Sequence, residues 1–387
     1  MKAWPTKPLG EVCELVNGRA FKPNEWQDAG LPIIRIQNLN DPTKPFNYTT
    51  HALPEKFKVR HGDTLLSWSG TPGTSFGCFR WDGPEGWLNQ HIFNVHLGEE
   101  ILPAFFIHQV NSKLNELITK AHGGVGLQHV TKGALSSVAI AVPPLAEQER
   151  IVKLLDEVDE LRKLRARADR RTADLIPALF HEMFGDPILN PHKWPKTTLG
   201  QTCQKLTDGT HFSPPPAEAG VPYITAKHLR EYGLDFDRDP TYVSLDNHRE
   251  IYARCDPKPG DVLYIKDGVT TGLAAVNRYD HEFSMLSSLA LMRPDATKCD
   301  SEFLCAWLND KAVKTSMLGQ MAGAAIRRLT LVKLKKTAIL LPPLPMQKEF
   351  ARRMTEVRVL KVKQATSRRR LEDLFQSLLH RAFQGEL

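Results

Sequence analysis

The sequence of 387 residues is long enough for two domains, each with a hydrophobic core of its own. Apolar residues make up 41% of the chain and charged residues 25%, as in a globular protein, and the lack of an apolar run of about 18 residues excludes a membrane-spanning helix. The net charge of +7 is too small to indicate nucleic-acid binding without a more specific signal.

Residues 1–142 are predicted to form a first domain. Short β-rich runs alternate there with glycine and proline, which is typical of strands joined by turns. The strands that this pattern predicts are Leu31–Ile36, Asp63–Trp68, Phe93–Leu97 and Ala134–Val142. An apolar stripe that includes Phe106 and Val110 predicts a helix over Pro103–His122. The domain is therefore expected to be of the α+β class, with a mixed or antiparallel sheet whose strand order the sequence does not give.

Residues 143–189 are predicted to form the first of two long helices. Pro143 and Pro144 stand before it, and proline suits the first turn of a helix because that turn has no partner for its N–H groups. Apolar residues then recur three, four or seven positions apart, at Ile151, Leu154, Val158, Leu161, Ala168, Leu175 and Leu179. The helix is expected to end at Phe184, where glycine and proline follow.

Residues 190–341 repeat the first domain. Trp4-Pro5 returns as Trp194-Pro195 at an offset of 190 residues, and Gly62-Asp63 returns as Gly260-Asp261 at an offset of 198. Ordered matches of this kind indicate a duplicated domain rather than chance similarity. The corresponding strands are predicted at Val221–Thr225, Asp261–Lys266, Ser288–Leu291 and Leu334–Leu341, and the corresponding helix at Ser301–Leu318.

Residues 342–387 are predicted to form the second long helix, which again follows a double proline. Its apolar positions, at coiled-coil spacing, are Phe350, Met354, Val357, Leu371, Phe375 and Leu378. A helix of about 40 residues is roughly 60 Å long. Because two matched helices are joined by a complete domain, we expect them to pair as an antiparallel coiled coil. Two separate amphipathic helices, each packed on its own domain, are the alternative.

Both apolar stripes are interrupted near the middle of the helices. The polar residues there are Arg165 and Thr172 in the first helix and Lys361, Gln364 and Arg368 in the second. Polar residues in a helix–helix seam reduce stability but specify register and partner. They are therefore expected to fix how the two helices align.

Motifs of common catalytic sites are absent from the sequence. There is no phosphate-binding G-x-x-x-x-G-K-[ST] loop, no strand-linked G-x-G-x-x-G, no H-E-x-x-H, and no N-P-P-[FY] motif of amino-methyltransferases. The 14 histidines do not stand at metal-ligand spacing, and the six cysteines form no Cys-x-x-Cys pair. The pattern predicts a non-catalytic protein without a metal or cofactor of its own, with reduced thiols, in the cytoplasm. The first residues lack the apolar stretch of a secretory signal.

The arrangement resembles the specificity subunit of type I restriction-modification systems over essentially the whole chain. The residues that carry the resemblance are Val142–Gln148 and Leu341–Gln347 at the helix entries, the two Gly-Asp pairs with the glycine-bearing loops after them, and Leu88–His91. Each motif is weak alone, but their duplicated order is specific. The second copy departs from the pattern at Met346, at Lys348 and at Ser287, which weakens the transfer of individual residue roles there.

The resemblance implies two target recognition domains that are held apart by an antiparallel helical spacer. Each domain would read one half of a bipartite, asymmetric site in double-stranded DNA. The same chain would bind two modification subunits, which methylate adenine, and through them the restriction subunits, which act as translocase and nuclease. S-adenosylmethionine, ATP and magnesium would then be bound by those partners.

Candidate DNA contacts are the polar residues on matching loops of the two copies, because forked donors and acceptors read base edges. In residues 1–142 they are Asn17, Arg19, Arg35, Gln37, Asn38, Ser67, Ser69, Thr71, Gln128 and His129. In residues 190–341 they are Asp208, Thr210, His211, Lys227, His228, Lys266, Asp267, Thr270, Arg327 and Arg328. Any one of them can equally be an ordinary solvated loop residue.

Two other functions remain open from the sequence. The chain can be a structural adaptor that binds proteins through its coiled coil and binds no DNA. It can also be a methyltransferase or nuclease itself, although the missing cofactor and metal motifs argue against that. Binding to DNA separates the first possibility from the specificity subunit, and methylation by the purified chain alone would support the second.

Overall fold

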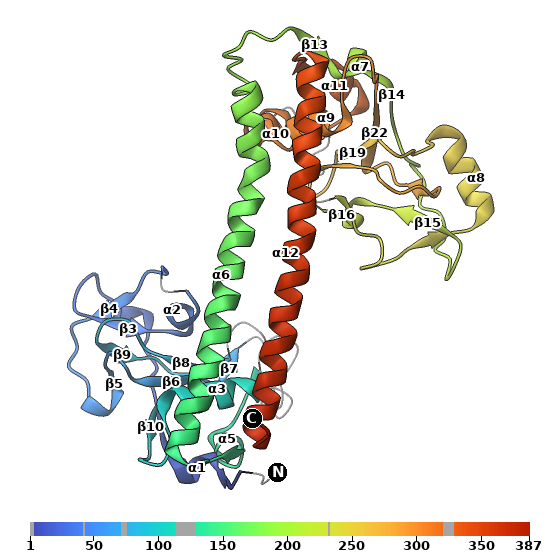
Figure 1. Cartoon of the computed structure of the whole chain (residues 1–387). Helices are drawn as coiled ribbons and strands as arrows, with labels where there is room; N and C mark the ends of the chain where they lie inside the picture. The colour runs from blue at the N-terminus through green and yellow to red at the C-terminus, as the bar shows by residue number, and fades with distance from the viewer. Residues whose placement is uncertain (1–3, 42, 71–75, 114–127, 231–232, 320–328) are drawn as a thin grey trace. The chain divides into compact units, whose positions relative to one another are not determined.

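A computed structural model describes residues 4–41, 43–70, 76–113, 128–230, 233–319 and 329–387, and the chain divides into two compact units (Figure 1). Unit 1 comprises Met1–Ala166 together with Thr366–Leu387, and unit 2 comprises Arg167–Ala365. The boundaries fall inside the two long helices. Each helix therefore contributes one of its ends to each unit.

A four-stranded antiparallel sheet is the centre of unit 1. Its strands, in spatial order, are β2 (Cys13–Asn17), β10 (Ile92–Leu97), β6 (Thr64–Ser67) and β8 (Gly77–Arg80). Successive side chains point to opposite faces. Leu66 and Phe93 join a core with helix α3 (Pro103–Ser112) and the long helices, whereas Leu65 and Ile92 join a second core. Both faces of this sheet are therefore buried.

The second core of unit 1 lies between that sheet and a mixed sheet. The mixed sheet consists of β4 (Asn47–Thr49), β3 (Leu31–Ile34), β9 (Gly86–Leu88) and β5 (Lys58–Val59). Strands β3 and β9 run parallel, and the other pairs run antiparallel. The sequence predicted a mixed or an antiparallel sheet, and the unit contains one of each.

Unit 2 repeats this architecture. Its antiparallel sheet consists of β14 (Cys203–Asp208), β22 (Leu289–Pro294), β19 (Val262–Ile265) and β20 (Ala274–Val276). The parallel pair returns as β15 (Val221–Ile224) with β21 (Ser284–Met285), and β18 (Tyr242–Val243) pairs with β15 on the other side. The expected α+β class with a duplicated domain is confirmed.

Short elements complete both units. The two-stranded pairs are β1 (Thr6–Pro8) with β12 (Ala139–Ala141), β13 (Lys196–Thr198) with β23 (Ala338–Leu340), β7 (Ser69–Gly70) with β11 (Gln128–His129), and β16 (Leu229–Arg230) with β17 (Gly233–Leu234). The short helices are α1 (Leu9–Val12), α2 (Ile36–Asn40), α5 (Lys132–Ser136), α7 (Leu199–Thr202), α11 (Leu331–Lys336), η1 (Pro23–Glu25), η2 (Glu55–Phe57) and η3 (Ala226–His228).

Two predicted strands are wrong at their beginnings. Residues 134–136 and 334–336 are helical, because a threonine before each of them caps a helix. The Thr131 hydroxyl accepts a bond from the Ala134 N–H, and the Thr330 hydroxyl accepts one from the Lys333 N–H. The strands begin only after these helices.

The helix predicted over Ser301–Leu318 is two helices, α9 (Ser301–Asn309) and α10 (Lys311–Gly319). Asp310 separates them, since its carboxylate accepts bonds from the N–H groups of Ala312 and Val313 and so starts a new helix. In unit 1, α3 ends at Ser112, and the rest of the helix predicted over Pro103–His122 lies largely outside the described residues.

Helix α8 (Leu245–Arg254) accounts for about half of the growth of the repeat offset from 190 to 198 residues. Thr49 and Val243 hold equivalent places, since they pair with Leu31 of β3 and Val221 of β15, so the offset is already 194 before α8 begins. In the described part of unit 1, the segment that matches α8 contains η2 and β5. Ser244 caps α8 by accepting a bond from the Asn247 N–H, and His248 and Ile251 are its buried residues. The helix lies at the margin of unit 2 (Figure 1).

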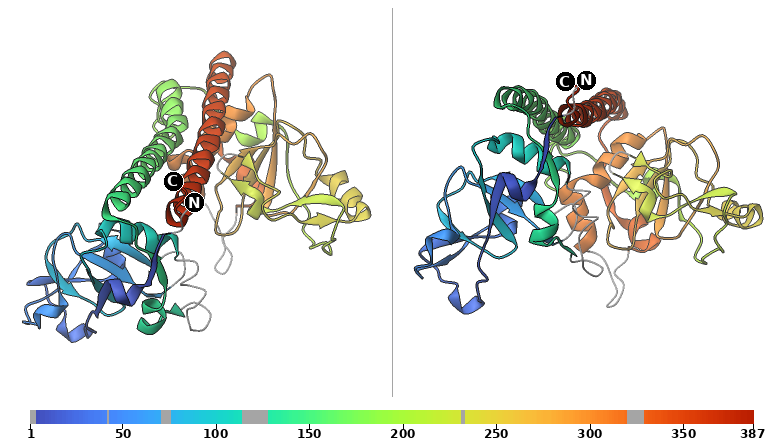
Figure 2. Two further views of the ribbon diagram at one scale, coloured as in Figure 1. Left: turned by 60° about the horizontal axis from the view of Figure 1, so that its bottom comes forward. Right: turned by 90° about the horizontal axis from the view of Figure 1, so that it is seen from below.

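The two long helices are α6 (Leu145–Phe184) and α12 (Leu344–Gln384), which both views of Figure 2 show unbroken, in green and red. In unit 1, Arg162 pairs with Glu372 at 2.7 Å, whereas in unit 2 the rings of Phe180 and Phe350 meet edge to face, with their centres 5.8 Å apart. Residue numbers rise along α6 where they fall along α12, so the helices pack antiparallel. The alternative, in which each helix packs only on its own domain, is wrong for these residues.

The interruption predicted in the apolar seam is a polar contact. The Gln364 side-chain amide donates a hydrogen bond of 2.8 Å to the Thr172 hydroxyl, and both residues are buried. Such a pair is satisfied only in one alignment of the helices.

The repeated glutamine after each double proline joins a long helix to its domain. Gln148 is fully buried, and its amide binds the carbonyls of Glu100 and Pro143 and the N–H of Leu102. Gln347 makes the equivalent three bonds in unit 2. This part of the repeat is therefore structural.

None of the helices in the described parts of the chain is both long and apolar enough to cross a membrane.

Candidate nucleic-acid interface

The predicted polar residues gather mainly at one end of the antiparallel sheet in each unit. In unit 1 this end is formed by the last residues of β2 and β6 and the first residues of β10, and in unit 2 by those of β14, β19 and β22. A glycine follows β2 and β14 because the backbone of another loop comes close: a Cβ on Gly18 would lie 2.0 Å from the Asn89 carbonyl oxygen, and one on Gly209 would lie 1.9 Å from that of Met285.

The sheet end of unit 1 is neutral and aromatic. The indole nitrogen of Trp68 donates a hydrogen bond of 3.2 Å to the Asn17 side-chain oxygen. The Trp68 ring stacks on Phe93 with ring centres 5.6 Å apart and meets the edge of His91 at 5.0 Å. A half-buried aromatic plate next to an amide is a surface suited to stacking and to neutral hydrogen bonds.

Arg19 lies close to this sheet end, and Glu25 balances its charge. It pairs with Glu25 and lies over the ring of Phe21, 5.0 Å from its centre. The backbone N–H of Lys22 and the guanidinium of Arg19 donate to the Glu25 carboxylate and hold its pKa below the ordinary value. This pairing fixes the direction of the arginine side chain.

The sheet end of unit 2 is ionic. Asp208 stands where unit 1 has Asn17, and Lys266 stands where unit 1 has Trp68, as their backbone bonds show: the Lys266 N–H donates to Ser288 as the Trp68 N–H does to His91. The Lys266 ammonium lies 3.4 Å from the Asp208 carboxylate, and these side chains are only 7% and 3% exposed. A buried carboxylate of this kind requires a charged partner.

Two further groups reach the same carboxylate from the solvent side. The Arg254 guanidinium donates a hydrogen bond of 2.7 Å to Asp208, and the ring nitrogen Nε2 of His211 lies 3.2 Å from it. Arg254 and His211 are 52% and 58% exposed at the side chain. The sequence analysis did not select Arg254, because it lies on helix α8, where the described part of unit 1 has η2 and β5 instead of a matching helix. The jump in the repeat offset is the signal that pointed to that segment.

The loop after Lys266 is held in one shape. Gly268 has a φ of +94°, and the Thr271 hydroxyl and N–H both bind its carbonyl oxygen. Asp267 pairs with Lys266 at 3.7 Å, and Thr270 is exposed at the tip. The predicted residues His211 and Lys266 thus contact Asp208 directly, and Asp267 joins them through Lys266.

Asn38 and His228 do not belong to an open surface. They occupy the same position in the two units, and both are buried. The Asn38 amide oxygen accepts a bond from the Arg35 N–H, and His228 Nδ1 accepts one from the Thr225 N–H. Burial lowers the pKa of the His228 imidazole. These side chains close a local turn. Their expected role as base contacts stays a prediction.

The remaining candidates fall into four groups. Ser67, Ser69 and Thr210 are buried, and Arg35, Gln37 and Lys227 lie beside the mixed sheets, bonded to Asn47, Pro45 and Asp239. Gln128 and His129 form β11, which pairs with Ser69 and Gly70 next to the sheet end of unit 1. Thr71, Arg327 and Arg328 lie outside the described residues.

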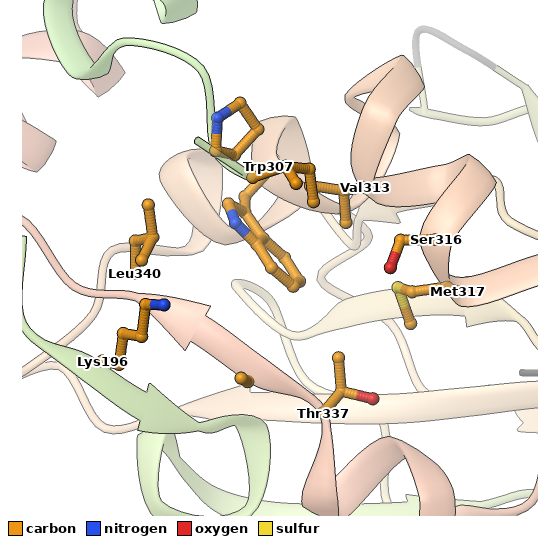
Figure 3. Close-up of a pocket in the computed structure, with 10 residues that line it drawn as sticks. Lys196, Trp307, Val313, Ser316, Met317, Thr337 and Leu340 are labelled. Carbon is orange, nitrogen blue, oxygen red and sulfur yellow. The ribbon is translucent and has the colours of Figure 1, made fainter. Parts of the chain in front are cut away.

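A separate pocket of about 200 Å³ lies in unit 2, with Trp307 at its centre (Figure 3). Its lining combines the apolar side chains of Val313, Met317 and Leu340 with the polar side chains of Lys196, Ser316 and Thr337. In unit 1, Gln109 takes the place of Trp307, and its amide binds the backbone of Ala141. None of the predicted DNA contacts among the described residues lines this pocket, so it is no part of the candidate interface.

Among the described residues no group of histidine, cysteine or acidic side chains is arranged to hold a metal ion, and the six cysteines are free thiols. Burial raises the pKa of the Cys13, Cys203 and Cys255 thiols to about 12. These thiols are therefore packing groups at neutral pH.

Comparison with known proteins gives one consistent result. A family model described as the type I restriction modification DNA specificity domain matches residues 1–168 and again residues 191–366. The specificity subunit of the type I restriction enzyme EcoBI from Escherichia coli is 24% identical over 423 aligned positions, which cover 100% of this chain and 86% of that protein. A putative MjaX specificity subunit from Methanocaldococcus jannaschii is 24% identical, with 92% and 86% covered.

Solved structures show the same fold. A chain from a study of complex assembly and conformational transition of the type I restriction-modification system superposes with a TM-score of 0.63, at 23% identity, over 100% of this chain and 99% of that one. The specificity subunit from M. genitalium gives a TM-score of 0.55 at 15% identity, over 98% and 96%.

Proposed function

The chain belongs to the family of the type I restriction modification DNA specificity domain, and we propose that it selects the DNA site for a type I restriction-modification complex. Each unit reads one half of a bipartite site. The observation that carries this proposal is the pair of equivalent sheet ends, one neutral and aromatic and the other ionic, in units that otherwise share one architecture. Two different surfaces on one scaffold suit two different half-sites.

The chain itself performs no chemistry in this proposal. Its relatives are named specificity subunits of restriction enzymes, which separates them from the subunits that act on DNA. Adenine methylation with S-adenosylmethionine, and ATP- and magnesium-dependent translocation and cleavage, then belong to modification and restriction subunits. The complex works where the DNA is, in the cytoplasm, which agrees with six free thiols.

The long helices bind the two modification subunits. Apolar side chains that are about half exposed lie on both helices, which supports an interface with further helices or loops. In unit 1 they include Leu161 and Leu164, at 50% and 52%, and in unit 2 they include Val359 and Val362, at 50% and 66%.

The helices also set the number of unread base pairs between the half-sites. Because α6 and α12 run without interruption from one unit into the other, their length has to enter the spacing. Insertion of seven residues in each helix at matching positions adds about 10 Å, or about three base pairs of DNA. We expect the spacer of the methylated site to grow accordingly. An unchanged spacer would contradict the proposal that the length of the helices sets the distance between the half-sites.

Genome-wide sequencing of methylated adenines tests the proposal directly. The strain with the intact gene is compared with one that lacks it, and the difference gives the bipartite site. The chain in complex with its modification subunit should then bind a duplex of that sequence with an affinity that falls steeply with salt. Absent or salt-insensitive binding favours the adaptor that binds proteins alone. Methylation by the purified chain without partners favours an enzyme.

A further inference from the structure

Helix α8 holds Arg254 in a fixed place at the sheet end of unit 2. His248, on the buried face of the helix, lies 3.0 Å from the Ser284 hydroxyl, and the Cys255 N–H donates to the Ile251 carbonyl where the helix ends. Arg254 is the last residue of the helix. Its backbone is therefore positioned by packing against the body of the unit.

The guanidinium of Arg254 is anchored on one side and open on the other. Its Nη2 donates to Asp208 at 2.7 Å and lies 3.1 Å from the ring nitrogen Nε2 of His211. Asp208 is itself held by the buried Lys266 ammonium. The Arg254 side chain nevertheless remains 52% exposed. An arginine held through one nitrogen keeps further N–H donors in a planar fork.

We propose that Arg254 is a DNA-contact residue that determines the half-site of unit 2, and that Asp208 positions it. Its free donors match paired acceptor atoms on DNA, which are the O6 and N7 atoms of guanine or the oxygens of a phosphate. This inference rests on the proposed function of the chain. It adds a residue from helix α8 to the interface, and the described part of unit 1 has η2 and β5 in place of that helix.

A purely structural role does not account for the arrangement. An ion pair made by an arginine that is half exposed contributes little to stability, because solvent screens it. The buried Asp208 carboxylate already has Lys266 at 3.4 Å for its charge. Unit 1 builds the same sheet end with the neutral pair of Asn17 and Trp68. The stability of unit 2 therefore does not require the Arg254 side chain, whereas its exposed N–H donors are placed to bind a ligand.

The test uses the full chain in complex with its modification subunit and duplexes that carry the methylated site. Arg254→Ala and Arg254→Lys are compared with Arg249→Ala, a control on the same helix whose side chain is 69% exposed and pairs with Asp246. Dissociation constants are measured for the cognate duplex, for the three other base pairs at each position, and at several salt concentrations.

Arg254→Ala is expected to weaken binding, whereas Arg249→Ala is not. If the partner is guanine, the loss is about 5- to 150-fold, is confined to one base pair, and is not restored by lysine, which lacks the fork. If the partner is a phosphate, the loss is uniform over sequences, the slope of log affinity against log salt falls by about one, and lysine restores most of it. Both outcomes support the contact and identify its source.

Asp208→Asn is expected to change the same base preference or salt slope as Arg254→Ala, which a residue with only a structural role would not do. The proposal is overturned if Arg254→Ala matches Arg249→Ala in affinity, base preference and salt slope. A wild-type complex that binds no specific duplex at all instead contradicts the proposed function itself.

Discussion

The two units use different side chains at equivalent ends of their antiparallel sheets, neutral ones in unit 1 and charged ones in unit 2. In unit 1, Asn17 and Trp68 form a neutral contact backed by Phe93. In unit 2, the equivalent positions hold Asp208 and Lys266, buried as an ion pair. The bonds that support the surroundings are nevertheless the same in both units. Asn111 binds the N–H and carbonyl of Cys78, and Asn309 binds those of Ala274.

This difference shows which positions of the duplicated domain can change in residue type. Residues that join one element to another were retained in the repeat, because each of them satisfies buried backbone groups that would otherwise be unpaired. Residues at the sheet end face solvent on one side and are free to change in type, provided that buried charges remain paired. A pair of readers can therefore diverge in specificity on a constant framework. The comparison can be tested by matched substitutions in the two units.

The largest difference is expected for the central residue of each sheet end. Asp208→Ala removes the nearer of the two carboxylates that face the buried Lys266 ammonium, which leaves only Asp267 at 3.7 Å, and should destabilise unit 2 by about 3 kcal/mol. Asn17→Ala removes one neutral hydrogen bond and should cost unit 1 about 1 kcal/mol. Hydrogen exchange of peptides from each unit measures the two effects separately. Equal losses would show that the ionic end is no more dependent on its partners than the neutral one.

The shared framework should respond equally in both units. Gln148→Ala and Gln347→Ala each leave one N–H and two carbonyl groups without their side-chain partner. We expect a loss of about 2–4 kcal/mol in each case, since unsatisfied buried groups are costly. The same exchange experiment reports the loss in unit 1 for the first variant and in unit 2 for the second. A loss in only one unit would contradict a common role.

Acid should weaken unit 2 through His228, which unit 1 replaces by Asn38. Burial lowers the pKa of His228 in the folded state, so the unfolded chain binds a proton first, near pH 6.5. Stability is therefore complete above about pH 6.5 and falls as the pH drops toward the lower folded pKa, by up to about 1.4 kcal/mol per pH unit. Unfolding free energies at pH 7.5, 6.5 and 5.5 for wild type and His228→Asn measure the effect. Parallel pH profiles of the two proteins would refute it.

The smallest effect is expected in the helix seam. Thr172→Ala leaves the Gln364 amide without its partner and should cost about 1 kcal/mol. Thr172→Ala together with Gln364→Leu should be close to neutral, because an apolar pair needs no hydrogen bond. Thermal unfolding of both variants measures the stabilities. If the double variant is less stable than the single one, the pair contributes more than its hydrogen bond.

The sequence was sufficient for features that are periodic or repeated. Helical spacing gave the two long helices and their antiparallel pairing, and α6 ends at Phe184 as predicted. The repeat located the sheet end, because matching loops of two copies must occupy matching places in the fold. These signals are spread over many residues and do not depend on the direction of any single side chain.

The features that the sequence did not show depend on where individual side chains point and what they contact. Arg254 reaches Asp208 across 46 positions, and nothing in the local pattern marks that approach. Asn38 and His228 are polar residue types in a loop, yet their side chains turn inward to bind the backbone. The two expected strands before the long helices begin as helices because a threonine cap outweighs the apolar pattern.

The division of the chain has a consequence for its synthesis. Unit 2 is continuous in sequence, whereas unit 1 needs Thr366–Leu387, which are synthesised after all of unit 2. Phe375, Leu379 and Ala382 belong to the core of unit 1, and the Ala382 carbonyl accepts a bond from the Trp4 indole. At about 5–20 residues per second, residues 1–166 are made on the order of 10–40 s before the helix segment that completes their core. The unit that is begun first can thus be completed only after unit 2 has been synthesised.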